Sequence, residues 1–292
     1  MLKAREQYFI IKIFLNIPLN KAFQITILFM DIFQIFILGL VQGVTEMLPI
    51  SSSAHLILFP KLLHWQDPGL NVDAFLHLGT LFAILIYFRK DLLNLVLDKS
   101  QRKLLLSIIV ATLPVVIIGF TCKPFFEHSL LLRSTKFIAF TLFIVAVLLF
   151  IADKVFPQKK EISDISFKDT VLIGLAQSLA LFPGVSRSGI CSLAGLGLGL
   201  NRAAAVRFAF LLGSPAIAGA GLLATKDLFE IYTAPGATFN LMSEGLYFAV
   251  GFFTSFLAGL ISIDFLIKFL SKNTFTLFVV YRIVLGVILL VI

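Results

Sequence analysis

The stretch GLVQGVTEMLPISSSA at residues 39–54 decides the fold, because the stretch GLAQSLALFPGVSRSG at residues 174–189 can be laid over it at an offset of 135. In each stretch a proline and a cluster of serines break an apolar run, which predicts an interrupted helix. Ala74-Phe75-Leu76 coincides with Ala209-Phe210-Leu211 at the same offset, so the sequence predicts an internal repeat. The identical positions of the two stretches are Gly39/Gly174, Leu40/Leu175, Gln42/Gln177, Ser51/Ser186 and Ser53/Ser188.

The composition is typical of a membrane protein. Hydrophobic residues make up 59% of the 292 residues and charged residues 14%, whereas soluble domains carry roughly 25% charged residues. These values exclude an ordinary soluble globular protein, a disordered chain and a secreted disulfide scaffold. Cys122 and Cys191 lie far apart and fit neither a disulfide framework nor a zinc site. The apolar runs lack the alternation of a β-barrel, so the predicted class is an all-α integral membrane protein.

The order of the apolar runs predicts the topology. Two broken segments, 32–63 and 171–200, are each followed by three runs that can span a bilayer. If each broken segment enters and leaves on one side, an odd number of spans separates them, and the second half is inverted relative to the first. The predicted fold is six transmembrane helices plus two re-entrant helical hairpins in inverted-topology repeats. The six spans are predicted at 74–88, 104–121, 136–152, 203–224, 245–267 and 275–292.

Residues 30–292 are predicted to form a single membrane domain, with repeat one at 30–153 and repeat two at 166–292. Residues 1–29 are interpreted as an N-terminal extension, in which polar residues interrupt the apolar ones and no signal peptide is recognisable. Two interpretations of the extension stay open: an interfacial helix, or a segment upstream of a true start at Met30. Within the first broken segment, Gly39 and Gly43 are expected to break the helix.

The formal net charge of +8 indicates a membrane surface rather than nucleic acid, because the Lys and Arg residues lie mainly in short gaps between apolar runs. The gaps 89–103 and 153–170 are basic, whereas 225–244 holds more acidic than basic residues. The positive-inside rule therefore predicts the first two in the cytoplasm and the third outside, so that the first hairpin enters from outside and the second from the cytoplasm. One basic gap then falls outside, against the rule, and it holds Lys123, Arg133 and Lys136.

The polar residues of the two broken segments are the candidate site. Gln42 and Glu46 are four residues apart and share a helix face, and a carboxylate at membrane depth is costly unless it meets a partner or a wet cavity. The second segment supplies Arg187, whose guanidinium forks onto phosphate oxygens. If the two tips meet, they suit attack on a phosphoryl group of a substrate with an apolar tail. The other candidate members are Ser51, Ser52, Ser53, His55, Gly184, Ser186, Ser188 and Gly189.

Each feature also has a simpler interpretation. The serine triplet is often a helix cap, PGVSRSG is often a turn, and Glu46 can pair with Arg187 to hold the fold or bind ions in a transporter. His77 is interpreted as a packed, hydrogen-bonded helix residue. Four further charged residues carry no motif: Arg202 and Arg207, expected to snorkel or to pair structurally, and Asp264 and Arg282, interpreted as buried charges.

The segments QGVTEMLPISSSAH (42–55) and PGVSRSG (183–189) resemble the two signature motifs of the undecaprenyl-diphosphatase family, bacitracin-resistance type, and 73–92 and 207–216 resemble that family as well. The resemblance runs from Met30 to the C terminus. It implies an integral enzyme of the bacterial inner membrane, with its site facing outward. Such an enzyme removes one phosphate from undecaprenyl diphosphate, which returns undecaprenyl phosphate to peptidoglycan synthesis and confers bacitracin resistance. A divalent cation, Mg²⁺ or Ca²⁺, is implied too.

The resemblance also implies residue roles. Glu46 matches the essential glutamate of the first motif, and Gln42 matches the Glu or Gln before it. Ser52 and His55 match the hydroxyl and the imidazole of that motif, and Arg187 matches the arginine of the second. The chain departs from the family pattern at Ala54, where Gly is usual, and at Cys191, where Thr is usual.

We predict that Arg187 clamps the phosphates, that Ser52 is the nucleophile with His55 as proton shuttle, and that Glu46 is a base or a ligand to Mg²⁺ or Ca²⁺. Direct attack by water stays open. The predicted partners are polyprenyl diphosphate, membrane lipids and a second copy in a homodimer, without nucleic acid. The alternative is a lipid-carrier transporter or flippase, which would release no phosphate unless it were also an enzyme. The expected substrate-binding residues are Gln42, Ser51, Ser53, Gly184, Ser186, Ser188 and Gly189.

Overall fold

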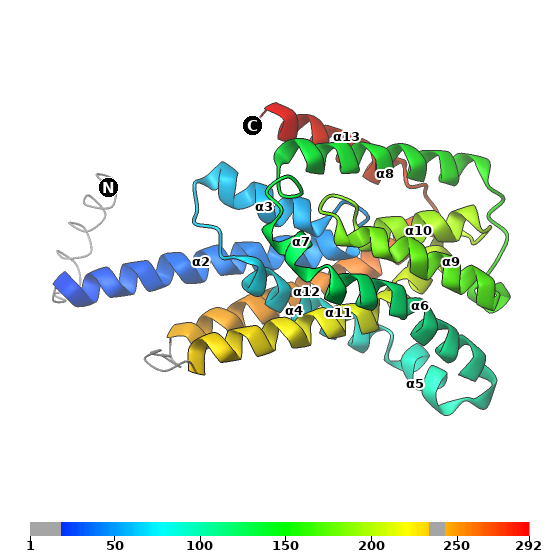
Figure 1. Cartoon of the computed structure of the whole chain (residues 1–292), viewed down its shortest axis with the longest axis horizontal. Coiled ribbons are helices and arrows are strands. Elements are labelled where there is room, and N and C mark those ends of the chain that lie inside the picture. The colour runs from blue at the N-terminus through cyan, green and yellow to red at the C-terminus, as the bar shows by residue number, and fades with distance from the viewer. Residues whose placement is uncertain (1–18, 234–242, 292) are drawn as a thin grey trace.

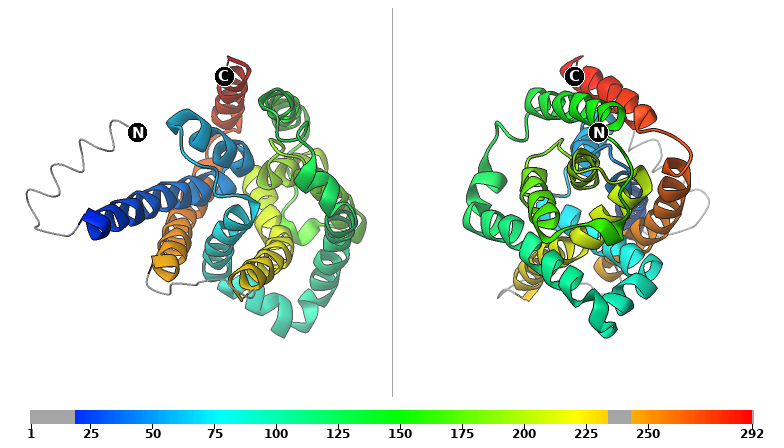
Figure 2. Two further views of the ribbon diagram at one scale, coloured as in Figure 1. Left: turned by 60° about the vertical axis from the view of Figure 1, so that its left-hand side comes forward. Right: turned by 90° about the vertical axis from the view of Figure 1, so that its right-hand side faces the viewer.

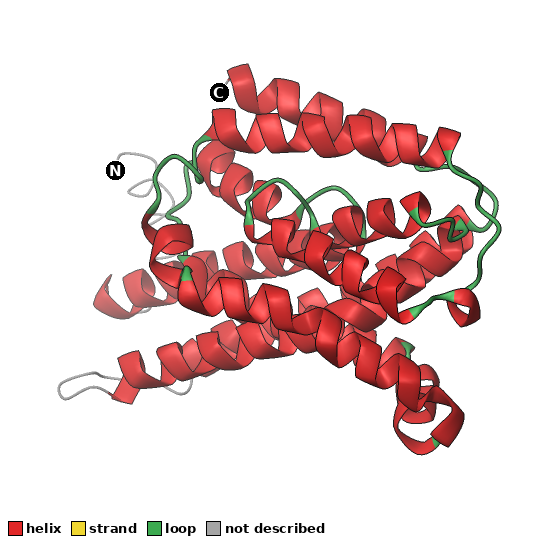
Figure 3. Ribbon diagram, turned by 45° about the vertical axis from the view of Figure 1, so that its right-hand side comes forward, coloured by secondary structure: helices red, strands yellow, loops and turns green. Residues whose placement is uncertain are grey.

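The computed structural model describes residues 19–233 and 243–291, and these residues fold into helices joined by short loops (Figures 1 and 3). No strand occurs within the described ranges, where Lys160 and Leu200 form an isolated bridge. The helices are α2 Leu19–Met47, α3 Ser52–Leu63, α4 Leu70–Tyr87, α5 Arg89–Leu97, η1 Lys99–Gln101, α6 Arg102–Thr121, α7 Lys123–His128, α8 Thr135–Val155, η2 Ile162–Asp164, α9 Phe167–Gln177, η3 Ser178–Leu181, α10 Arg187–Gly197, α11 Arg202–Thr233, α12 Ser243–Leu270 and α13 Thr276–Val291.

The predicted all-α membrane class is confirmed. Within the described ranges, four helices are long and apolar enough to cross a membrane, namely those at Lys99–Thr121, Thr135–Val155, Arg202–Glu230 and Glu244–Leu270. A fifth crossing is counted if α4 and α5, which are bent by 70° relative to each other, are taken as one span. α13 is apolar but shorter. Large apolar side chains such as Phe120 and Ile261 are exposed on the outside, as expected where lipid replaces water.

The two predicted interruptions are present. Residues 48–51, the first loop, separate α2 from α3, and residues 182–186, the second loop, separate η3 from α10. Each loop ends in a serine with positive φ, 75° at Ser51 and 70° at Ser186. Each of these serines caps the next helix by accepting a hydrogen bond from the backbone N–H three residues later. The two loops therefore repeat one turn at the offset that the sequence shows.

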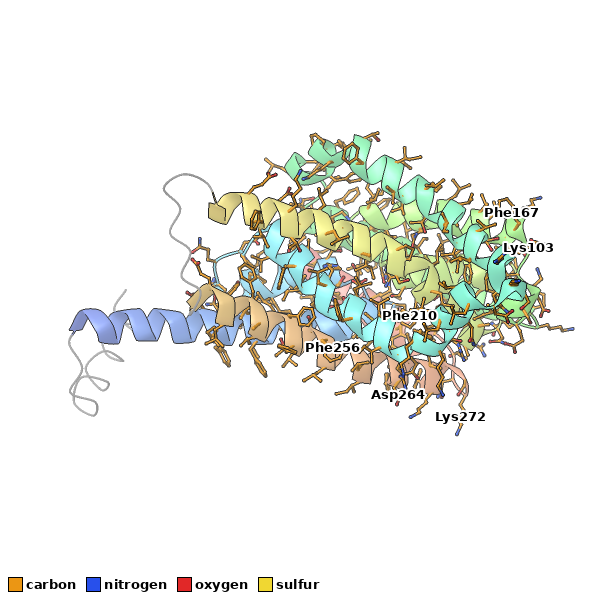
Figure 4. All side chains as sticks on the ribbon, turned by 90° about the horizontal axis from the view of Figure 1, so that it is seen from below. Lys103, Phe167, Phe210, Phe256, Asp264 and Lys272 are labelled. Carbon is orange, nitrogen blue, oxygen red and sulfur yellow. The ribbon has the colours of Figure 1, made fainter. Side chains whose placement is uncertain are left out.

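Helix packing brings the two halves together. α12 packs against α2 and α4, and α6 packs against α9 and α11. α4 also contacts α11, and α8 runs beside α13 along one edge of the molecule (Figures 1 and 2). Phe210 is fully buried among the helices, while Lys103 and Phe167 lie at the end away from the start of α2 (Figure 4). The points at which the two segments are broken are buried, as the low exposure of Ser51 and Ser186 shows.

The prediction that Gly39 and Gly43 break the first segment is wrong. α2 runs without interruption through both residues. A Cβ atom on Gly39 would lie 2.9 Å from the Gly251 carbonyl oxygen, and one on Gly43 would lie 2.6 Å from the Ser255 carbonyl oxygen, both on α12. The glycines therefore allow close helix packing, which small residues commonly provide in membranes.

Replacing Gly43 with alanine is expected to lower the free energy of unfolding by about 1–3 kcal/mol, because α12 must move to admit the methyl group. Thermal unfolding in detergent measures the effect. Gly119→Ala on α6 is the control, since its Cβ atom would meet only the Leu181 side chain at an ordinary 3.5 Å. Equal unfolding temperatures for the two variants would contradict the packing role.

The predicted N-terminal extension is covered only in part. Residues 1–18 lie outside the described residues. From Leu19 onward the chain is helical, and α2 continues past Met30 without a break.

Candidate active site

Glu46 and Arg187 meet at the centre of the two broken segments. Glu46 lies in the last turn of α2, and Arg187 is the first residue of α10. Oε1 of Glu46 accepts hydrogen bonds from Nε and Nη2 of Arg187 at 3.3 and 3.2 Å. Both side chains are almost completely buried. The predicted convergence of the two tips is therefore confirmed, and it occurs through a forked, charge-assisted contact.

Ser52 completes this contact from a third helix end. Its hydroxyl donates to Oε2 of Glu46 at 2.7 Å, and Ser52 is the first residue of α3. The amino ends of α3 and α10 thus lie at one carboxylate. The first N–H groups of a helix have no intrahelical partner and favour anions. A phosphate group that enters here would meet two helix amino ends, one guanidinium and one hydroxyl.

Arg187 retains capacity to bind a ligand. Besides the two bonds to Glu46, its Nη1 donates to the Ala209 carbonyl oxygen of α11 at 3.0 Å. A guanidinium has five N–H donors. The contacts of the described residues account for three, so two N–H groups have no acceptor among the described residues.

The other serines join the two loops. The Ser188 hydroxyl donates to the Leu48 carbonyl oxygen at 3.1 Å, and the Gly184 N–H donates to the Ser53 hydroxyl at 3.3 Å. Hydroxyl pairs lie 3.2 Å apart at Ser51/Ser53 and again at Ser186/Ser188. These bonds hold the loops against each other. A role for these serines in binding substrate, and likewise for Gln42 and Gly189, stays a prediction.

His55 lies away from these contacts. Its Nδ1 is 2.7 Å from the Ser51 carbonyl oxygen, and its Nε2 is 2.7 Å from the Tyr281 hydroxyl of α13. The two rings also stack, with centroids 5.6 Å apart. Both ring nitrogens are therefore engaged, and none of the described hydrogen bonds joins His55 to Glu46, Ser52 or Arg187. Its role as proton shuttle stays a prediction.

Two residues of the site were not predicted from the sequence, although both lie in segments that resemble the family, His77 in 73–92 and Gly213 in 207–216. Nε2 of His77 lies 3.3 Å from Oε2 of Glu46, and its Nδ1 is 2.7 Å from the Asp73 carbonyl oxygen. The interpretation of His77 as a packed, hydrogen-bonded residue is correct but misses the contact with Glu46. Gly213 of α11 is the second residue, because a Cβ atom there would collide with the Arg187 guanidinium.

Replacing Gly213 with alanine is expected to lower the turnover of this site by about 10²-fold, because the methyl group displaces the Arg187 guanidinium from Glu46. Gly219→Ala on the same helix is the matched control, since a Cβ atom there meets nothing within 4 Å. Both changes raise helix propensity alike, by about 1 kcal/mol. Similar turnover in the two variants would show that the guanidinium position is not critical.

The predicted divalent cation does not fit the described residues as a resident ion. Within the described ranges no three His, Cys, Asp or Glu side chains gather in a way that could hold a metal. Glu46 is the carboxylate of the cluster, and its oxygens already accept from Arg187 and Ser52. A hard cation needs six or more oxygen ligands.

A cavity of about 710 Å³ lies elsewhere, between the start of α11, α5 and the end of α12. Arg207 lines it and pairs with Asp91 at 3.0 Å, and Arg202 lines it and pairs with Asp153 at 2.5 Å. The expected structural pairing of both arginines is therefore confirmed. The cavity contains none of Glu46, Ser52 and Arg187, so the hydrogen-bond geometry, rather than cavity size, defines the candidate site.

Fold and site together define a polytopic helical membrane protein in which two interrupted helices join a carboxylate, a hydroxyl and a guanidinium. The family model described as bacitracin resistance protein BacA matches residues 35–288, so the chain belongs to that family. Curated relatives named undecaprenyl-diphosphatase are similar to almost the whole chain. The relative from Myxococcus xanthus is 41% identical over 274 residues, which cover 90% of this chain and 89% of the relative. Those from Desulforudis audaxviator and Geotalea daltonii are 41% and 43% identical, covering 90% of this chain and 98% of each relative.

Proposed function

We propose that this protein hydrolyses the phosphoanhydride of undecaprenyl diphosphate, which yields undecaprenyl phosphate and inorganic phosphate. It thereby recycles the lipid carrier of peptidoglycan synthesis and confers resistance to bacitracin. The observation that carries the proposal is the pair of contacts on Glu46, with the Ser52 hydroxyl at 2.7 Å on one oxygen and Arg187 at 3.2 Å on the other. A nucleophile, its base and an anion-binding group are then within reach of one phosphoryl group. The family and the relatives favour this enzyme over a transporter.

The geometry supports a two-step mechanism. Ser52 Oγ attacks the terminal phosphorus while Oε2 of Glu46 takes the hydroxyl proton. The bond from that phosphorus to the bridging oxygen breaks, and undecaprenyl phosphate leaves with the electron pair. Arg187 and the amino ends of α3 and α10 stabilise the charge on the phosphoryl oxygens. Water then attacks the phosphoserine, and the bond from phosphorus to Ser52 Oγ breaks. Oγ leaves with the electron pair and takes the proton back from Glu46, which releases dihydrogen phosphate and restores both residues.

Phosphate release tests the proposed function. Purified protein in detergent is given a polyprenyl diphosphate, and inorganic phosphate is measured for the wild type beside Glu46→Ala and Arg187→Ala. The wild type is expected to turn over and both variants to be nearly inactive. Absence of phosphate from a folded wild-type sample would contradict an enzymatic function. Acid quenching after a short reaction with substrate labelled in the terminal phosphate tests Ser52, because label retained on the protein identifies a phosphoserine, whereas its absence favours direct attack by water.

The proposed topology is six transmembrane helices and two re-entrant hairpins in inverted repeats. The packing between the halves supports it: α2 of the first half packs on α12 of the second, and α9 of the second half packs on α6 of the first. We place the protein in the bacterial inner membrane with the site facing outward, and we propose a homodimer. Labelling of single engineered cysteines in cells by a membrane-impermeant reagent tests the orientation, and mass measurement in detergent tests the dimer.

We propose that the divalent cation binds together with the substrate and does not bind tightly to the substrate-free protein. In phosphoryl-transfer sites Mg²⁺ usually keeps several waters and is held by substrate phosphate oxygens together with one or two carboxylates. Chelation by EDTA is expected to stop phosphate release, and restoring Mg²⁺ or Ca²⁺ is expected to recover it. Calorimetry of the substrate-free protein is expected to show no tight Mg²⁺ site, because the cluster offers a single carboxylate. Full turnover in EDTA would remove the cation from the proposal.

A further inference from the structure

Arg282 is a buried cation that the proposed mechanism does not use. It lies on α13, and its side chain is 0% exposed. Among the described residues it forms no ion pair with a carboxylate, and its hydrogen-bond acceptors are three backbone carbonyl oxygens. A buried charge without a counter-ion is costly and is retained where it has a function. Asp264, interpreted from the sequence as a second buried charge, is instead half-exposed and pairs with Lys268 at 2.6 Å.

The three acceptors belong to the parts of the chain that build the site. Nη1 donates to the Pro49 carbonyl oxygen of the first loop at 3.2 Å, and Nη2 donates to the Gly184 carbonyl oxygen of the second loop at 2.8 Å. Nε donates to the Leu142 carbonyl oxygen of α8 at 3.3 Å. The neighbouring α8 residue Thr141 also donates to the second loop, at the Pro183 carbonyl oxygen, at 2.8 Å.

The two loop carbonyls are equivalent positions of the internal repeat. Pro49 and Gly184 are related by the offset of 135 that aligns the two signature stretches. Each lies two residues before the cap serine with positive φ, and three residues before the first residue of the next helix. Those first residues are Ser52 and Arg187. One planar guanidinium, whose two terminal nitrogens are themselves equivalent, therefore joins the same atom of both halves.

We propose that Arg282 is a positioning residue for the phosphoanhydride reaction, because it sets the distance between the loop that carries Ser52 and the loop that carries Arg187. This proposal rests on the proposed function. Arg282 is expected to affect the part of the site that holds the diphosphate and to leave the part that holds the apolar tail unchanged. Lysine cannot replace it, because an ammonium is a compact point charge that does not reproduce the planar fork between two carbonyls.

The test compares Arg282→Lys with the wild type and with Arg202→Lys, an arginine that pairs with Asp153 away from the site. Three quantities are measured in detergent: turnover of a polyprenyl diphosphate, the inhibition constant of methylenediphosphonate, and the inhibition constant of a polyprenol without phosphates. Neither inhibition constant depends on how much of a sample is folded. For Arg282→Lys we expect turnover to fall by about 10²-fold and the methylenediphosphonate constant to rise by about tenfold, with the polyprenol constant unchanged. Arg202→Lys should resemble the wild type in all three.

The outcomes separate the proposal from its alternatives. If Arg282 only stabilises the fold, turnover falls with the folded fraction while both inhibition constants stay at wild-type values, and the proposal is overturned. If both constants rise together, the whole site is distorted, and the proposal is again overturned. A wild type that releases no phosphate overturns the proposed function itself, which is a different result. If Arg282→Lys does not fold, the same three quantities are measured for Thr141→Val. This variant removes the hydrogen bond from the Thr141 hydroxyl to the Pro183 carbonyl oxygen of the second loop. An unchanged methylenediphosphonate constant in that variant overturns the positioning of the loop, and a selective rise supports it.

Discussion

Replacing Arg187 with alanine is expected to lower kcat/KM for polyprenyl diphosphate by about 10³-fold, since arginines that neutralise a transferring phosphoryl group have effects of this size. The guanidinium contacts Glu46 through two nitrogens and Ala209 through a third, so its orientation is fixed before a substrate binds. A pre-oriented donor needs little reorganisation during the reaction, and for this reason it acts on the transition state. Phosphate release in detergent measures the change.

Two further variants sharpen the result for Arg187. Arg187→Lys keeps the charge but loses the fork, so its activity should lie well below that of the wild type. Arg207→Ala is the control, because its partly exposed pair with Asp91 is expected to contribute about 1 kcal/mol or less to stability. Near-normal turnover of Arg187→Ala would show that the clamp has been assigned to the wrong residue.

Replacing Glu46 with glutamine is expected to lower kcat by about 10³-fold, because general-base catalysis by a positioned side chain contributes about 10²–10⁴-fold. Glutamine keeps the size of the side chain but cannot take the proton that the Ser52 hydroxyl donates across 2.7 Å. The phosphoserine that acid quenching would trap in the wild type should also be absent. Turnover and trapping are measured on the same samples.

The competing interpretation of Glu46 is purely structural. Removing one partner of a buried ion pair commonly costs about 3–5 kcal/mol of stability, so the thermal unfolding temperature of Glu46→Gln must be measured alongside its turnover. A folded sample at the assay temperature with about 10³-fold lower turnover supports the base. A variant that unfolds more readily but turns over normally, once corrected for the folded fraction, would assign Glu46 to the fold.

The sequence predicts the helices well because their apolar runs are long. The six runs expected to span a membrane coincide with α4, α6, α8, α11, α12 and α13. The interruptions near Pro49 and Pro183 were also predictable, since a proline followed by a serine cluster ends one helix and caps the next. That Glu46 and Arg187 lie near the broken points of their segments was predictable too, whereas the contact between them depends on the two tips meeting, which the structure shows.

The remaining features depend on distant neighbours, which local sequence does not reveal. The sequence predicts that Gly43 breaks a helix, whereas the structure shows that Gly43 lets α12 pack closely against α2. The contact between Nε2 of His55 and the hydroxyl of Tyr281, which lies 226 residues later in the chain, has no signal in the local sequence. Gly213 and Arg282 lie in apolar helices outside the two signature motifs. The role of Gly213 depends on the Arg187 side chain, and that of Arg282 depends on the two loops.

The forked contact of Arg282 with both loops has a consequence for how the molecule can be divided. The carboxylate and the hydroxyl come from the first half of the chain, and both arginines come from the second. Neither half is therefore an autonomous catalyst. Two polypeptides made by cutting the gene between α8 and α9 would have to reassemble before Glu46 and Ser52 could meet Arg187.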